Sequence, residues 1–250
     1  KARQILRGVN QNLSISGDST TLEAVMNETE IKAVLDQTID QSIEIVRRRV
    51  DELGTTEPSI ARQGDDRILL QVPGADAEQL KRIVGKTAKL SFHMVKDIMG
   101  GERSVSSKTL PMLDEPGREI SIERRALITG EMLDTAAPSF DQTGQPVVTF
   151  RFNSQGARRF CQVSTDNVNK PFAIVLDEEV ISAPVIREPI CGGSGQISGG
   201  FDVQGANDLA VLLRAGALPA PLTVMEERTV GPSLGADSIA AGQVASLSAM

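Results

Sequence analysis

The sequence predicts an α+β protein in which a ferredoxin-like base subdomain carries an inserted α+β head subdomain. Residues 27–95 show helix, strand, strand, helix and strand patterns in that order, and residues 121–200 show a second mixture of strands and one helix. Residues 204–230 return to a helix and an extended segment. Helices gathered on one face of an antiparallel sheet are typical of this class. We expect the first part of the base and a connector at 1–120, the head at 121–203 and a return to the base at 204–237.

The base opens with a long amphipathic helix at residues 27–53. Its apolar residues recur at spacings of three and four and form one stripe: Ile31, Leu35, Ile39, Ile43, Val46, Val50 and Leu53. Asn27 is placed to cap the first turn, and Gly54 suits the left-handed residue that ends a helix. Arginines 47–49 span nearly a full turn, so we expect a mostly solvated face with one arginine paired to Glu57 or Asp51.

Three strand patterns and a second helix complete the first part of the base. The strands are expected at 58–62, 67–72 and 90–94, and the helix at 76–84. The single histidine, His93, falls on the polar phase of the third strand, so we expect a surface or half-buried residue there. Residues 12–16 form either a first strand of the same sheet or an extended leader.

A connector and the head follow. Gly, Ser and Pro interrupt residues 96–120, which indicates a domain boundary or a long surface loop. The head pattern consists of strands at 126–129, 148–152, 172–176, 180–183 and 196–198 and one helix at 153–165. Three leucines at 209, 212 and 213 predict a helix that ends at Gly216, and residues 222–230 are expected to close the base sheet as a strand.

The composition and motifs offer no catalytic machinery. The net charge is −7 and Trp and Tyr are absent, which argues against a nucleic acid partner. Ser194 lies in GGSGQ, which departs from the nucleophile elbow, and the nearby glycines lack the Lys and Ser/Thr of a phosphate loop. Two cysteines and one histidine, far apart, do not make a zinc site. We expect no catalytic residue, no metal and no cofactor, and solvated acids in the turns at 65–66 and 177–179. Cys161 and Cys191 are compatible with one disulfide or with two buried thiols.

Several motifs, in one order along the chain, carry a family resemblance. They are QSIEIVRRRVDELG at 41–54, RQG at 62–64, VPG at 72–74, FRF at 150–152, VISAP at 180–184, GGSGQISG at 192–199, LLRAGALPAP at 212–221 and GPSLG at 231–235. With their neighbours they cover roughly residues 27–242, and they resemble the first large periplasmic domain of the protein translocase subunit SecD.

The resemblance implies a non-enzymatic part of a protein-export machine. It implies a protein anchored in the bacterial inner membrane, with this region facing the periplasm, and SecF and the SecYEG channel as partners. The substrate implied is an unfolded secretory preprotein, whose translocation the proton-motive force helps to complete. Residues 238–250 would then begin a membrane-spanning helix that is truncated here, where composition favoured a frayed tail. An oxidising periplasm gives Cys161 and Cys191 the opportunity to pair, which would tie the head helix to the Gly-rich loop.

Gripping many unrelated unfolded chains requires adaptable apolar surface and exposed strand edges. The candidates for preprotein contact are six apolar head residues, each of which has a place in the core as its alternative: Phe150, Phe152, Ile174, Ile181, Ile190 and Ile197. A hinge between base and head is expected at Gly117, Arg118, Gly199 and Gly200.

Two other classes of function remain open at this point. The first is a soluble α+β domain that binds a small ligand or acts as a regulatory module. The second is a hydrolase on an unfamiliar fold, which the lone histidine disfavours because no Ser–His–Asp or Cys–His set has a stronger anchor.

Overall fold

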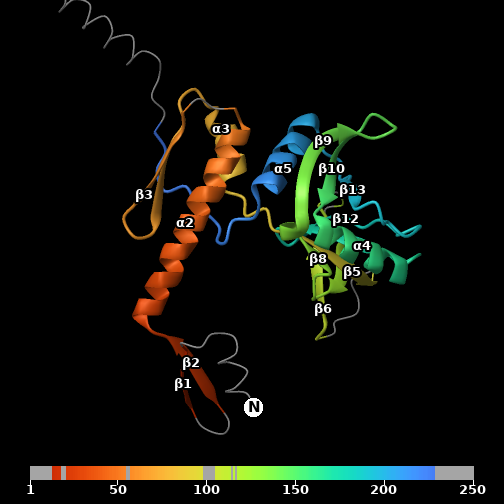
Figure 1. Ribbon diagram of the computed structural model, residues 1–250, viewed down its shortest axis with the longest axis horizontal. Helices are drawn as coiled ribbons and strands as arrows, with labels where there is room; N and C mark the ends of the chain where they lie inside the picture. The colour runs from red at the N-terminus through yellow and green to blue at the C-terminus, as the bar shows by residue number, and fades with distance from the viewer. Residues whose placement is uncertain are drawn as a thin grey trace, which may run out of the picture.

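The structure is a computed structural model of the 250-residue chain, and it describes residues 13–17, 21–54, 57–97, 105–113, 115 and 117–228. These residues form a mixed arrangement of helices and antiparallel sheets, which confirms the predicted α+β class. The base precedes the head along the chain, the segment from about residue 218 returns to the base core, and Figure 1 shows base and head side by side.

The helices begin and end close to the predicted positions. They are α2 (Glu28–Glu52), α3 (Ala77–Val84), α4 (Ser154–Asp166) and α5 (Val203–Ala215). A side chain caps the start of each, as the Oδ1 of Asn27 accepts a hydrogen bond from the backbone N–H of Glu30 at 2.7 Å. Gly54 follows α2 with a φ of 69°, the left-handed conformation expected of a residue that ends a helix.

The base is built on α2. Strands β3 (Ser59–Gln63) and β4 (Arg67–Gln71) form an antiparallel hairpin that packs against this helix together with α3. Apolar side chains from all these elements and from the segment after α5 share one core: Val46, Val50, Ile60, Leu70, Leu80, Val84, Leu218 and Leu222.

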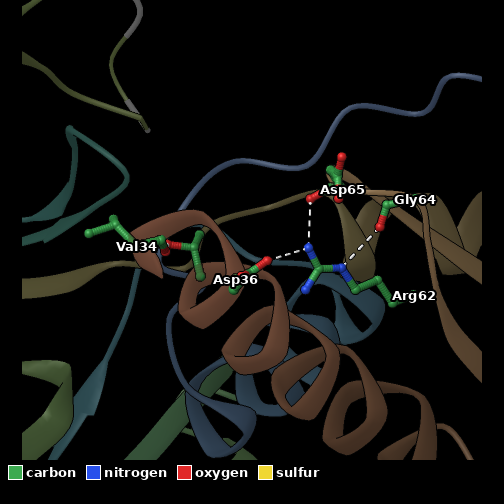
Figure 2. A network of polar contacts seen from close by, with 6 residues as sticks. Val34, Asp36, Arg62, Gly64 and Asp65 are labelled. Atoms are coloured by element: carbon green, nitrogen blue, oxygen red, sulfur yellow. Dashed lines mark hydrogen bonds and ion pairs between the residues drawn. The ribbon is translucent and has the colours of Figure 1, made fainter. Parts of the chain in front are cut away.

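The guanidinium of Arg62 fastens the β3–β4 turn to α2. Figure 2 shows it between Asp36 on the helix and the backbone of the turn. Its Nη2 donates to Asp36 Oδ1 at 2.5 Å and to the carbonyl of Asp65 at 3.0 Å, and its Nε donates to the carbonyl of Gly64 at 3.0 Å. The hydrogen bond to Asp36 raises the pKa of Arg62. One side chain thus sets where the hairpin lies along the helix.

The described residues do not complete a ferredoxin-like base sheet. The predicted third strand, β5 (Leu90–Asp97), pairs with strands of the head, and residues 222–228 carry no strand. At the start of the chain, β1 (Leu13–Gly17) pairs with β2 (Leu22–Met26) and lies at the far end of α2 (Figure 1). The predicted strands at 12–16 and 90–94 are therefore present, but they pair with other strands than those of the base sheet.

The described residues of the head form two antiparallel sheets. One contains β12 (Glu179–Ser182), β11 (Phe172–Leu176), β5, β7 (Glu119–Glu123) and β6 (Ser107–Pro111) in that order, with β8 (Ile128–Thr129) also paired to β5. The other contains β13 (Ser194–Ile197), β10 (Pro146–Phe152) and β9 (Leu133–Phe140). A parallel bridge between Met112 and Val180 brings the two ends of the larger sheet together, so this sheet curls on itself. The predicted connector at 96–120 therefore contains β6 and the start of β7.

The head core centres on Phe92 of β5. Its ring centroid lies between 5.5 and 6.5 Å from those of four other phenylalanines, which are contributed by β10, α4 and β11: Phe150, Phe152, Phe160 and Phe172. Helix α5 adds Leu209, Ala210 and Leu213 to the same cluster. A smaller apolar cluster fills the inside of the curled sheet and includes Ile120, Ile122 and Val175.

His93 is buried, unlike the surface or half-buried position predicted for it. The larger sheet curls over the second face of β5. The face that carries His93 is therefore covered, as is the face that carries Phe92. The Nδ1 of His93 lies 2.7 Å from the carbonyl oxygen of Glu123, and its Nε2 lies 3.0 Å from the hydroxyl of Ser91. A carbonyl only accepts, so the neutral ring carries its proton on Nδ1.

Acidification is expected to destabilise the protein through His93. Burial lowers the pKa of His93 from its ordinary 6.5, so the unfolded chain binds a proton at a higher pH than the fold does. The stabilising contribution is full above about pH 6.5 and is lost as the pH falls towards the pKa of the folded state. Urea unfolding at pH 7.5 and 5.5 should therefore show a larger loss of stability in the wild type than in His93→Asn. Equal losses in the two proteins would contradict this prediction.

Candidate functional site: the junction of base and head

In the described residues the chain passes between the base core and the head core at two places. The first is residues 85–89, between α3 and β5, and the second is residues 216–218, after α5. The two segments touch, because the backbone N–H of Leu218 donates to the carbonyl of Thr87 at 2.8 Å. The junction is therefore a single structural unit made from distant parts of the sequence.

Arg49 of α2 holds both crossing segments. Its side chain is fully buried and donates to the carbonyls of Ile83 at 2.7 Å, Thr87 at 3.2 Å and Gly216 at 3.1 Å, and also to those of Val84 and Lys86. The carbonyls of Ile83 and Val84 belong to the last turn of α3, where intrahelical partners are missing. Burial lowers the pKa of Arg49 to about 10, so the guanidinium remains charged at neutral pH. Arg47 and Arg48 are exposed as predicted, whereas Arg49 departs from the mostly solvated face predicted for arginines 47–49.

Asp177 of the head binds the first crossing segment, residues 85–89, through hydrogen bonds. It lies in the turn between β11 and β12, and its carboxylate accepts from the hydroxyl of Thr87 and from the backbone N–H groups of Ala88 at 2.9 Å and Lys89 at 2.8 Å. Ala88 has a φ of 57°, a conformation that alanine rarely adopts without such restraint. The predicted role of Asp177 as a solvated turn acid is corrected to that of a junction residue.

Helix α5 faces the head on one side and the base on the other. Its Val211 and Leu212 pack with Ile83 of α3, opposite the leucines that enter the head core. Arg82 of α3 forms an ion pair with Asp208 at 3.2 Å. Arg214 forms another with Glu52 of α2 at 2.7 Å. The return to the base from residue 204 stays a prediction: α5 adds Leu209, Ala210 and Leu213 to the head core, and the chain enters the base core at Leu218.

The residues predicted as hinges lie elsewhere. Gly117 and Arg118 sit in the turn of the β6–β7 hairpin, where the backbone N–H of Arg118 donates to the carbonyl of Glu115. Gly199 and Gly200 connect β13 to α5 within the head, and a Cβ at Gly199 would lie 2.7 Å from the Cγ2 of Ile181. Neither pair lies where the chain passes between the two cores.

The predicted contact surface is mostly core. Phe150, Phe152, Ile174, Ile181 and Ile197 are each no more than 5% exposed. Ile190 is half-buried and packs against the same cluster. In this structure five of the six residues thus have a packing role, because the two head sheets and both helices turn their apolar faces towards one another.

Cys161 of α4 and Cys191 form a disulfide, and their sequence separation is 30 residues. The bond ties the Gly-rich loop before β13 to the helix. Two further contacts hold the same loop: the backbone N–H of Ile190 donates to Ser164 Oγ at 2.8 Å, and that of Phe152 donates to the carbonyl of Gly193 at 2.8 Å. Position 193 requires glycine for this close packing, because a Cβ there would lie only 2.7 Å from the Cβ of Ala157 on α4.

Comparison with known proteins identifies the family. Residues 39–97 match the family model described as protein translocase subunit SecDF, P1 domain, N-terminal, and residues 107–220 match SecDF, P1 head subdomain. SecD from Rickettsia bellii is 46% identical over 98% of this chain and 49% of its own length. SecD from Rhodobacter capsulatus is 48% identical over 97% of this chain and 45% of its own length. The chain belongs to the SecD family of protein translocase subunits.

Solved SecDF structures share the arrangement seen here. The super-membrane-facing form of SecDF superposes with a TM-score of 0.67 at 32% identity and covers 84% of this chain and 30% of that one. A structure described as that of a membrane component SecDF that enhances protein export gives a TM-score of 0.62 at 29% identity and covers 87% of this chain and 98% of that one. The chain spans about half the length of the SecD relatives that it matches.

In the described ranges no helix has the length and apolar content that a membrane crossing requires. The predicted membrane-spanning start at 238–250 lies outside those ranges.

The junction residues were not predicted from the sequence, although one signal was available for Arg49. It lies three residues after Val46 and one before Val50, which places it on the buried stripe of the helix.

Proposed function

We propose that this chain is the P1 region of a SecD-type subunit that promotes protein export through the Sec channel. The observation that carries the proposal is that both parts of the P1 domain match in order and that SecD relatives align over nearly the whole chain. The region acts in transport and not in catalysis. SecF and SecYEG are its partners in the bacterial inner membrane.

In this proposal the region faces the periplasm and contacts preprotein that emerges from the channel. The disulfide between Cys161 and Cys191 supports an oxidising compartment, because such bonds persist outside the reducing cytosol. The proton-motive force acts through other parts of the full-length protein and helps to complete translocation. The junction at residues 85–89 and 216–218 replaces the glycines as the proposed site of movement between base and head.

The test is an export assay in cells depleted of SecD. A full-length SecD carrying this chain as its P1 region is expected to restore processing of a pulse-labelled periplasmic precursor. A protonophore should remove the gain, and the same protein lacking residues 107–220 should not restore processing. Processing no faster than in depleted cells, with the protein present at normal abundance, would refute the proposal.

A further inference from the structure

A cleft of about 430 Å³ lies between the end of α3 and the first half of α5. Base and head each contribute a wall, and the floor is apolar. Leu113, Leu176, Ile181 and Phe201 come from the head, and Leu209 and Leu212 come from α5. Leu113 is 46% exposed, so part of this apolar surface is open to solvent. A volume of this size accommodates more than one side chain of a ligand.

The mouth of the cleft offers hydrogen-bond donors whose capacity is unused. Arg82 and Lys86 line it from the base, and Asp202 and Asp208 line it from α5. One oxygen of each carboxylate is engaged, because Asp202 Oδ1 accepts from the backbone N–H of Gly205 at 2.6 Å and Asp208 Oδ2 pairs with the Nε of Arg82. The other oxygen of Asp208, Oδ1, is buried without a hydrogen-bond partner. Among the described residues no carboxylate pairs with Lys86, and the terminal nitrogens of Arg82 have no ion-pair partner either. The mouth therefore offers unused donors beside an unused acceptor, and it complements a ligand that carries both hydrogen-bond acceptors and donors.

A ligand that combines apolar groups with neutral acceptors is an extended polypeptide. Its backbone carbonyls accept hydrogen bonds, and its larger side chains fill an apolar floor whatever their exact shape. A fully anionic amphiphile fits less well, because the two carboxylates at the mouth and the net charge of −7 oppose it.

We propose that this cleft binds one extended apolar segment of an unfolded polypeptide. A large apolar side chain rests on the floor beside Leu113 and Phe201, and backbone carbonyls accept from Arg82 and Lys86. The inference rests on the proposed function and deepens it, since it assigns the contact with preprotein to one place. Of the six head residues predicted for this contact, only Ile181 lines the cleft, so the proposal moves the contact largely to a surface shared by base and head.

The test compares two exposed apolar residues of the head. Leu113 lines the cleft, whereas Val185, which is 51% exposed, does not. The probe is a fluorescein-labelled, permanently unfolded polypeptide without cysteine, with Leu and Phe every few residues, and its partner probe carries Ser at those positions. Fluorescence anisotropy with the whole chain should give a Kd at least about 10-fold weaker for Leu113→Asp, because a carboxylate on the floor must be desolvated on binding. Val185→Asp should stay within about twofold of the wild type, as surface changes away from a site usually do.

Each remaining outcome has a distinct meaning. Equal binding of the apolar polypeptide by the two variants would overturn the cleft assignment and leave the proposed function standing. Equal binding of the apolar and Ser probes would overturn the role of the floor. Sedimentation with phosphatidylglycerol vesicles that is lost only in Leu113→Asp, without polypeptide binding, would make the cleft a lipid site and overturn the proposal. Failure of the proposed function would instead appear in the export assay, where the variants are not used.

Discussion

Replacing Arg49 by Met is expected to lower the free energy of unfolding by about 3 kcal/mol, because several buried carbonyls lose a charged donor. Five carbonyls from α3 and both crossing segments accept from this one guanidinium. Methionine has a similar length and no donor, so the loss reflects unpaired acceptors more than a cavity. The lowered pKa of Arg49 means that removing the charge also relieves some desolvation, which keeps the expected loss below the sum of five hydrogen bonds.

Urea unfolding followed by circular dichroism provides the measurement. Arg48 is the matched control, because it directly precedes Arg49 in the same helix and is exposed. Arg48→Met should change the free energy of unfolding by no more than about 0.5 kcal/mol. Arg49→Lys should fall between the two, since an ammonium keeps the charge but has three donors and no planar fork. An Arg49→Met protein as stable as Arg48→Met would mean that water satisfies the junction carbonyls.

Loss of the disulfide is expected to lower the free energy of unfolding by about 3–4 kcal/mol, which is the chain-entropy value for a loop of this length. The wild type should show the loss when reductant is added, and the double variant Cys161→Ser, Cys191→Ser should show it without reductant. The effect should concentrate near the Gly-rich loop, because Gly193 and β13 are held against α4 by this bond and by few other contacts.

The control for this prediction is the double variant itself. Reductant acts on the wild type through one bond, so it should leave the stability of the double variant unchanged. Amide hydrogen exchange should speed up in β13 and the preceding loop of the reduced wild type, while β11 keeps its protection. Unaltered stability and exchange after verified reduction would show that the other contacts suffice to hold the loop.

The local structure and the family could be predicted from the sequence. The apolar spacing and caps of α2 and α4 depend on residues within a few positions of one another, so the chain itself carries them. The same holds for the β3–β4 turn and for the continuous apolar run of β11. The SecD resemblance depends on motifs read one after another along the chain.

The pairing of strands and the place of the junction were settled by contacts between distant residues. β5 has the pattern of a half-buried strand, but its partner residues lie up to 86 positions further along the chain, and they decide that it joins the head and that His93 is buried. Arg49 and Asp177 look like surface charges in their own segments, and they become junction residues only because the carbonyls and N–H groups of residues 83–89 and 216 reach them. Buried polar groups must find partners wherever the fold supplies them, and that requirement has no local pattern.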